Sequence, residues 1–362
     1  MNTVNPIETK KKDLKKAEAR LRLKKILFPV CGFLLLTVLG ILSASYGAAS
    51  ITAWDVVKSV AAKLLPCSGM KSTPLADTIV WSLRLPRIGM AVVAGAGFAV
   101  SGVAMQGIMR NPLVSPFTVG ISSGAGFGAS LAIVTGMGVI GSGHTLIICN
   151  AFFFAVLSAC LVYGVARIRG ISPETLILSG IALMYLFSAA TSMLQYVATE
   201  HQLQGVVFWL FGSLSSATWK NCAMTMIVLA AAMPFLIRYS WDLNVLATGD
   251  EVALSLGVNA NRVRVVIMLC ATLVTATIIC FTGIIGFVCL VAPHITRMII
   301  GSDHRILVPF AAIVGALLLL AADTVGRTIM VPAEIPVGII MAFIGVPMFL
   351  YLLVTKRRRF FQ

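Results

Sequence analysis

The sequence predicts an all-α polytopic membrane protein with about ten transmembrane helices, and three observations lead to this fold class. Of the 362 residues, 59% are hydrophobic and 11% are charged, whereas about a quarter of the residues are charged in an ordinary soluble domain. Apolar stretches long enough to cross a bilayer recur along the chain. The 31 glycines and 16 methionines suit helices that pack closely in lipid.

The chain begins with a basic segment, residues 1–25, that carries nine Lys or Arg and three acidic residues. A nucleic-acid tail is one interpretation, but the apolar run that follows at once favours a cytoplasmic, lipid-facing tail. Residues 26–45 resemble a signal peptide in ending on small residues. Their apolar core is longer than the ~7–15 residues usual there, so we interpret them as a retained first span.

Apolar stretches after the first span complete one transmembrane domain over residues 26–355. The boundary between the seventh and eighth stretches is the least defined, because the apolar run continues through Thr282 and Gly283. Lys and Arg are more frequent in the loops that this count places inside, which puts both termini, including the basic tail 356–362, in the cytoplasm. The ten predicted spans are residues 26–45, 87–108, 117–138, 144–166, 174–198, 222–240, 263–283, 284–300, 307–328 and 335–355.

A long outer segment, residues 46–86, separates the first two spans. Within it, residues 51–65 are amphipathic at helical spacing, which predicts a helix on the membrane surface. Arg84 and Arg87 lie three residues apart at its end. They are either interfacial anchors or groups that meet a partner.

Glycines and prolines shape the next part of the chain. Gly120, Gly124 and Gly128 recur every fourth residue, which predicts a close helix contact. Residues 110–116 contain two prolines and an asparagine, which predict a stiff inner turn. No GxxxxGK[ST] motif occurs, so the chain does not bind ATP through a P-loop.

Polar residues within the spans are few. A stripe in the fifth span either forms hydrogen bonds between helices or lines a wet path; it comprises Ser188, Thr191, Ser192 and Gln195. Asp323 and Arg327 are four apart in the ninth span and can pair on one helix face. The eight cysteines form no CxxC pair and only Cys67 lies in a clearly polar segment, and the four histidines are scattered, so neither a disulfide framework nor a metal site is predicted.

Residues 247–262 form a polar stretch within an inner loop, 241–262. Thr248 or Gly249 can serve as N-cap, Asp250 and Glu251 fall in the first turn, and Gly257 can take the left-handed position after the helix. A helix this short is marginal alone and needs something to pack against. It is either a loop that joins two spans or a docking surface for a soluble partner inside the cell.

Six short motifs, taken together, resemble the FecCD family of cobalamin and iron-siderophore permeases, the membrane subunits of type II ABC importers. The resemblance covers roughly residues 80–355 and leaves the basic tail 1–25 outside. The motifs are RLPR (84–87), NPL-xx-P (111–116), GDEVALSLGV (249–258), GFVCLVAPHITR (286–297), GSDHR (301–305) and AEIPVG (333–338).

The resemblance implies a transport subunit, not an enzyme, that needs no cofactor of its own. It implies a second permease subunit in a dimer in the cell (inner) membrane, two cytoplasmic ABC ATPase subunits that hold ATP and Mg²⁺, and an outer binding protein that delivers a metal chelate. No nucleic-acid partner is implied. Ferric siderophore is the first choice of substrate, with haem and cobalamin as alternatives.

The resemblance also implies roles for particular residues. The inner gate corresponds to Ser172, Pro173 and Glu174, where relatives often carry small hydroxyl residues. Binding-protein docking corresponds to Arg84, Arg87 and Arg327, and the polar stripe of the fifth span to the translocation path. Coupling to the ATPase corresponds to Gly249, Asp250, Glu251, Ala253, Leu256 and Gly257.

Two other function classes were weighed. A secondary transporter of a small organic solute is the alternative, but such proteins need ionisable or ion-coordinating groups near the midplane, and the sequence offers no credible set. A membrane-embedded enzyme would need a nucleophile, a base or a metal cluster, and the motifs offer none.

Overall fold

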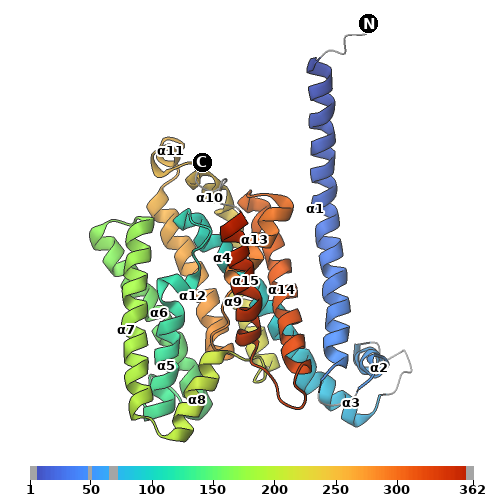
Figure 1. The fold of residues 1–362 in the computed structure, drawn as a ribbon, viewed down its shortest axis with the longest axis vertical. Helices are drawn as coiled ribbons and strands as arrows, with labels where there is room; N and C mark the ends of the chain where they lie inside the picture. The colour runs from blue at the N-terminus through green and yellow to red at the C-terminus, as the bar shows by residue number, and fades with distance from the viewer. Residues whose placement is uncertain (1–5, 48–50, 65–71, 356–362) are drawn as a thin grey trace.

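The computed structural model describes residues 6–47, 51–64 and 72–355, and within these ranges the chain is helical, without a strand (Figure 1). The all-α fold class is therefore confirmed. The expectations for residues 1–5, for the tail 356–362 and for Cys67 lie outside the described residues.

Each of the ten predicted spans corresponds to a helix. Seven helical stretches are long and apolar enough to cross a membrane, and they are Ile26–Ser45 within α1 (Pro6–Ser45), Pro74–Met109, α6 (Gly143–Arg169), α7 (Pro173–Val197), α9 (Trp219–Arg238), α12 (Ala260–Thr282) and α14 (His304–Thr328). Three shorter apolar helices match the remaining predictions, and they are α5 (Ile121–Thr135), α13 (Val288–Ile300) and α15 (Val337–Thr355).

The second span is longer than predicted. Helix α3 (Pro74–Thr78), a π-helical turn (Ile79–Arg84) and α4 (Leu85–Met109) follow one another without a break. Pro86, which has no N–H to donate, stands where the π-helical turn passes into α4. Earlier in the chain than α3, helix α2 (Ala53–Leu64) matches the amphipathic helix predicted over residues 51–65.

Helix α4 forms the centre of the bundle, and most of its residues are buried. Its glycines allow neighbouring backbones to come close. A Cβ at Gly95 would meet the backbone of Gly315 in α14, and a Cβ at Gly102 would meet the backbone of Cys289 in α13. Small residues thus allow α4 to cross α13 and α14 closely.

The predicted glycine ladder also packs as expected. A Cβ at Gly120 would meet Ser158 of α6, one at Gly124 would meet the backbone of Phe154, and one at Gly128 would meet the backbone of Asn150. The contacted residues are four apart on α6, so one face of each helix makes the whole contact. This prediction is confirmed.

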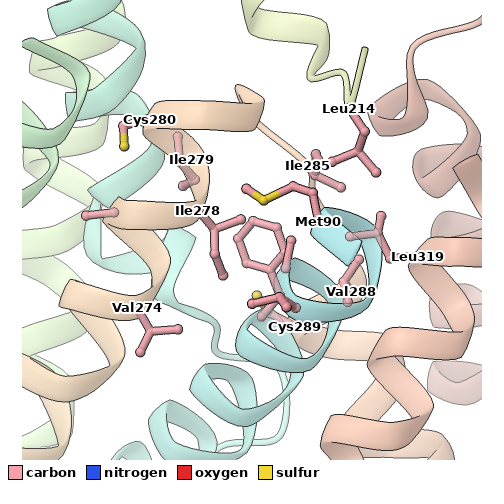
Figure 2. Close-up of a cluster of buried hydrophobic side chains, with 14 of the residues drawn as sticks. Met90, Leu214, Val274, Ile278, Ile279, Cys280, Ile285, Val288, Cys289 and Leu319 are labelled. Carbon is pink, nitrogen blue, oxygen red and sulfur yellow. The ribbon is translucent and has the colours of Figure 1, made fainter. Parts of the chain in front are cut away.

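Buried apolar side chains form two large clusters, one in each half of the bundle. In the cluster nearer the predicted outer end, Met90 of α4 lies among Ile278 of α12, Val288 of α13 and Leu319 of α14 (Figure 2). Cys280 and Cys289 belong to the same cluster. The interpretation of these two cysteines as small hydrophobic residues fits this environment.

The two ends of the helix bundle differ in the short helices that lie there. Helices α10 (Ser240–Leu246) and α11 (Asp250–Ser255) lie at the end from which α1 starts, which is the predicted cytoplasmic end, whereas α2, α3 and α8 (Glu200–Phe211) lie at the other (Figure 1). The uncertain seventh boundary falls after Thr282, where Gly283 takes a φ of +70° and ends α12. Helix α13 then begins at Val288.

Candidate functional site

The predicted coupling segment folds as a short, capped helix, α11. Gly249 is its N-cap with a φ of +117°, while the hydroxyl of Thr248 donates to the carbonyl of Val245. Asp250 and Glu251 stand in the first turn, as predicted. Acidic side chains there are stabilised by the partial positive charge of the helix N-terminus.

The end of α11 is a Schellman motif. Gly257 has a φ of +80°, its N–H donates to Leu254, and the N–H of Val258 donates to Ala253. The prediction of a left-handed glycine is confirmed. Ala253 and Val258 also pack in one apolar cluster, which adds the hydrophobic contact typical of this motif.

The outward surface of α11 is apolar. Val252, Leu254 and Leu256 are 45%, 71% and 64% exposed, whereas Ala253 is buried against its own chain. The helix stands clear of the bundle end in Figure 1. Exposed leucines on a helix of this length are typical of a surface that another protein covers. The sequence analysis missed Val252 and Leu254, although apolar residues inside a polar loop were the available signal.

A buried arginine holds α11 to the bundle. Arg264 of α12 is 1% exposed, and its Nη2 donates to Oδ1 of Asp250 at 2.8 Å. Nη2 of Arg110 lies 3.6 Å from the same oxygen. The hydrogen bond from Arg264 and the charges of both arginines lower the pKa of Asp250. No motif in the sequence singles out Arg264, because its partners come from distant segments of the chain.

The predicted inner gate is the start of α7. Ser172 is the N-cap, and its hydroxyl accepts from the N–H of Thr175 at 3.2 Å. Pro173 occupies the first turn and Glu174 follows as its acidic residue. All three residues therefore have a local reason to stand here, since they start a helix.

The polar stripe of the fifth span, on α7, divides in two. Ser188 and Ser192 are exposed and Gln195 is partly buried. Thr191 is buried, and its hydroxyl donates to the carbonyl of Phe187 in the same helix at 2.8 Å. Ser188, Ser192 and Gln195 could therefore line a translocation path between this chain and a second subunit, whereas Thr191 could not.

The three arginines predicted to dock a binding protein gather at the predicted outer end, and Asp323 lies between Arg87 and Arg327. Arg327 pairs with Asp323 at 3.1 Å, which confirms the predicted i, i+4 pair, and Arg87 pairs with the same carboxylate at 2.9 Å. Arg87 also reaches Glu334 at 2.7 Å, and its side chain is 12% exposed. The carboxylate of Asp323 on α14, through its ion pair with Arg87 on α4, joins these two helices.

Arg84 and Arg327 close the C-terminal end of α1. Arg84 donates to the carbonyls of Ala44 and Ser45, and Arg327 donates to the carbonyl of Ser43. These carbonyls belong to the last turn of α1 and have no partner within the helix. Both guanidinium groups therefore hold α1 in place, a role that the sequence could not show because the three segments are distant in the chain.

A cavity of about 710 Å³ is lined in part by α8, at the predicted outer end of the bundle. The sequence analysis missed it, and α8 with it. The capping box formed by Thr199 and Gln202 at the start of α8 was the available signal. The lining residues include His144, His201, Gln202, Phe208, Trp209, Ser213, Thr282 and Glu334.

Comparisons with known proteins agree on one class. A sequence model of the FecCD transport family matches residues 35–355. A cobalamin import system permease protein of Halobacterium salinarum is 41% identical, over 78% of this chain and 75% of the relative. An Fe(3+)-citrate import system permease protein of Bacillus subtilis is 38% identical, over 78% of this chain and 84% of the relative.

A solved structure is similar along nearly the whole chain. It is described as an inward-facing conformation of a metal-chelate type ABC transporter. The TM-score is 0.79 with 34% identity, and the similarity covers 91% of this chain and 99% of the other. Sequence and fold comparisons thus point to the same set of proteins.

Proposed function

Because the chain belongs to the FecCD transport family, we propose that it is the membrane-spanning permease subunit of an ATP-driven importer of a metal chelate. In this proposal it acts in the inner membrane with both termini in the cytoplasm. ATP and Mg²⁺ are bound by two separate cytoplasmic ATPase subunits, and a binding protein delivers the chelate from outside.

The observation that carries the proposal is the apolar surface of α11. Leu254 of this six-residue helix and Leu256, its C-cap, are both exposed at the predicted cytoplasmic end. Leaving these side chains uncovered is unfavourable by roughly 1.5–3 kcal/mol each relative to burial. An ATPase subunit that covers α11 explains why they are there.

Purification of the permease with its ATPase subunits tests this role. We expect Leu254→Asp to abolish retention of the ATPase on the permease, because a carboxylate would lie in an apolar contact. Ile168→Asp is the matched control, since Ile168 is 84% exposed in the last turn of α6 at the same end. Equal ATPase retention by both variants would contradict docking through α11.

The proposed cargo is a metal chelate, with ferric siderophore as the first choice and haem or cobalamin as alternatives. The two relatives described above are named for cobalamin and for Fe(3+)-citrate, which supports a chelate and leaves a choice of metal and ligand. Identification of the ligand that co-purifies with the cognate binding protein is the measurement that selects among them.

We further propose that two copies of the chain enclose the path. The exposed Ser188 and Ser192 support this, because hydroxyl groups on the outer surface of a spanning helix gain from facing water. The binding protein would dock at the outer end near Arg87, which lies beside the exposed carboxylate of Glu334. Arg84 and Arg327 would hold α1 beside that surface.

A further inference from the structure

Arg264 contacts three segments that are far apart in the chain. Its Nε donates to the carbonyl of Ile108 at 3.3 Å, its Nη1 to the carbonyl of Ile171 at 3.0 Å and its Nη2 to Asp250 at 2.8 Å. No segment contributes twice. The side chain is therefore a three-way junction at the predicted cytoplasmic end.

Two of these segments are inner turns of the bundle. Ile108 lies in the last turn of α4, where carbonyls lack helix partners, and the chain then turns at Arg110 with a φ of +49°. Ile171 directly precedes the start of α7 at Ser172. Both turns are thus joined to the same guanidinium group.

The third segment is α11 itself, which has few other attachments to the bundle. Ala253 is its one buried residue, and the rest of the helix is exposed or half-buried. The ion pair with Asp250 is a charge-assisted hydrogen bond, and such bonds are about twice as strong as neutral ones. A displacement of α11 would therefore act on Arg264 directly.

The planar guanidinium suits this junction. Arginine presents five donors in a fixed fork, whereas lysine offers a single charged nitrogen on a flexible stem. A lysine at this position would keep the charge but could not hold two carbonyls and a carboxylate with separate nitrogens.

We propose that Arg264 is a positioning residue that transmits movement of α11 to the two inner turns, at residues 108–110 and 171–174. When the ATPase shifts α11, the guanidinium carries the ends of α4 and α7 with it. The inference rests on the proposed function, since it requires an ATPase that displaces α11.

The first experiment measures amide hydrogen exchange of the permease alone in nanodiscs. We expect Arg264→Lys to speed exchange in residues 106–111, 170–176 and 250–258 together. Arg262→Gln is the matched control, because Arg262 lies two residues away on α12 and is exposed. If the lysine variant and the parent protein exchange equally in all three segments, the inference is overturned. This result does not depend on the proposed function, because no ATPase is present.

The second experiment uses the assembled transporter in proteoliposomes. We expect Arg264→Lys to retain the ATPase and to hydrolyse ATP, while transport per ATP falls, because lysine cannot join α11 to both inner turns through separate nitrogens. The exchange response of residues 170–176 to ATP should disappear. Normal transport per ATP, or a preserved response, would contradict the junction.

Asp250→Asn provides a second variant if the lysine protein does not assemble. It weakens the ion pairs that α11 makes with Arg264 and with Arg110 and leaves both carbonyl contacts of Arg264 in place, so a drop in transport per ATP is expected here as well. Glu200→Gln is its control, because Glu200 is an exposed acidic residue in the first turn of α8, away from α11. An unchanged ratio in Asp250→Asn would overturn the inference. A parent permease that retains no ATPase would instead contradict the proposed function.

Discussion

Gly257 shows how one residue sets the shape of the coupling surface. A Cβ at this position would meet no atom within 4 Å, so only the φ of +80° demands glycine. We expect Gly257→Ala to destabilise α11 by about 1 kcal/mol, because alanine resists the left-handed conformation. Amide exchange in residues 250–258 should rise about fivefold.

Gly164→Ala is the control for that substitution. Gly164 lies within α6, where a Cβ also meets no atom within 4 Å and no left-handed backbone is required. It should leave exchange in α11 unchanged. Equal exchange rates in α11 for both variants would show that the left-handed glycine does not stabilise this helix.

The ion pair of Asp250 gives a prediction for pH. Its pKa is lowered from an ordinary value of 3.8, chiefly by the hydrogen bond from Arg264. A lowered carboxyl pKa means that the stabilisation is complete above 3.8 and is lost as the pH falls through the folded-state pKa. We therefore expect protection of α11, corrected for intrinsic exchange, to be constant from pH 7 to about 4.5 and to fall only at more acidic pH.

Asp250→Asn should remove that acid transition, since the amide does not titrate. A loss of α11 protection between pH 7 and pH 5 in the parent protein would contradict the assignment to Asp250.

Among the helices, those with a long apolar run, a regular glycine spacing or clear caps were predicted, and α8 was missed. Long apolar runs and the four-residue glycine spacing depend on local sequence, and both correspond to helices in the structure. Helix α8 has no such run, and the signal for it was a capping box alone. The end of α12 is set by Gly283, and hydropathy does not report backbone conformation.

The candidate site was predictable in part for the same reason. The caps of α11 are local, and the sequence identified Gly257 correctly. The partners of Arg264 and Arg84 come from segments that only the fold brings together. Their contacts are with backbone carbonyls, and carbonyls leave no trace in the residue types of the partner segment.

The glycine ladder between α5 and α6 carries a prediction about stability. A Cβ at Gly124 would press on the backbone of Phe154, so the helices would have to separate. We expect Gly124→Ala to destabilise the permease by roughly 1–3 kcal/mol, measured as a lower melting temperature in nanodiscs.

Gly126→Ala is the control on the same helix. There the new Cβ would mainly meet the flexible end of Leu210, which can move away. The same melting temperature for the Gly124 and Gly126 variants would contradict the close contact between α5 and α6.

At the scale of the whole molecule, the exposed hydroxyls of α7 predict a water-accessible surface in the dimer. In a background without reactive cysteines, Ser188→Cys and Ser192→Cys should be labelled by a water-soluble thiol reagent in the assembled transporter. Ser158→Cys is the control, because Ser158 is fully buried on α6. If neither α7 cysteine reacts in any state of the ATP cycle, the polar stripe packs against protein and does not line a water-filled translocation path.

The proposed function requires that this chain moves cargo only when an ATPase drives α11. Uptake of the chelate by proteoliposomes that hold the permease, the ATPase and the binding protein tests this requirement. Uptake should stop when ATP is withheld and continue when ionophores collapse the ion gradients. Uptake that persists without ATP and stops when the gradients collapse would contradict it and identify a secondary transporter.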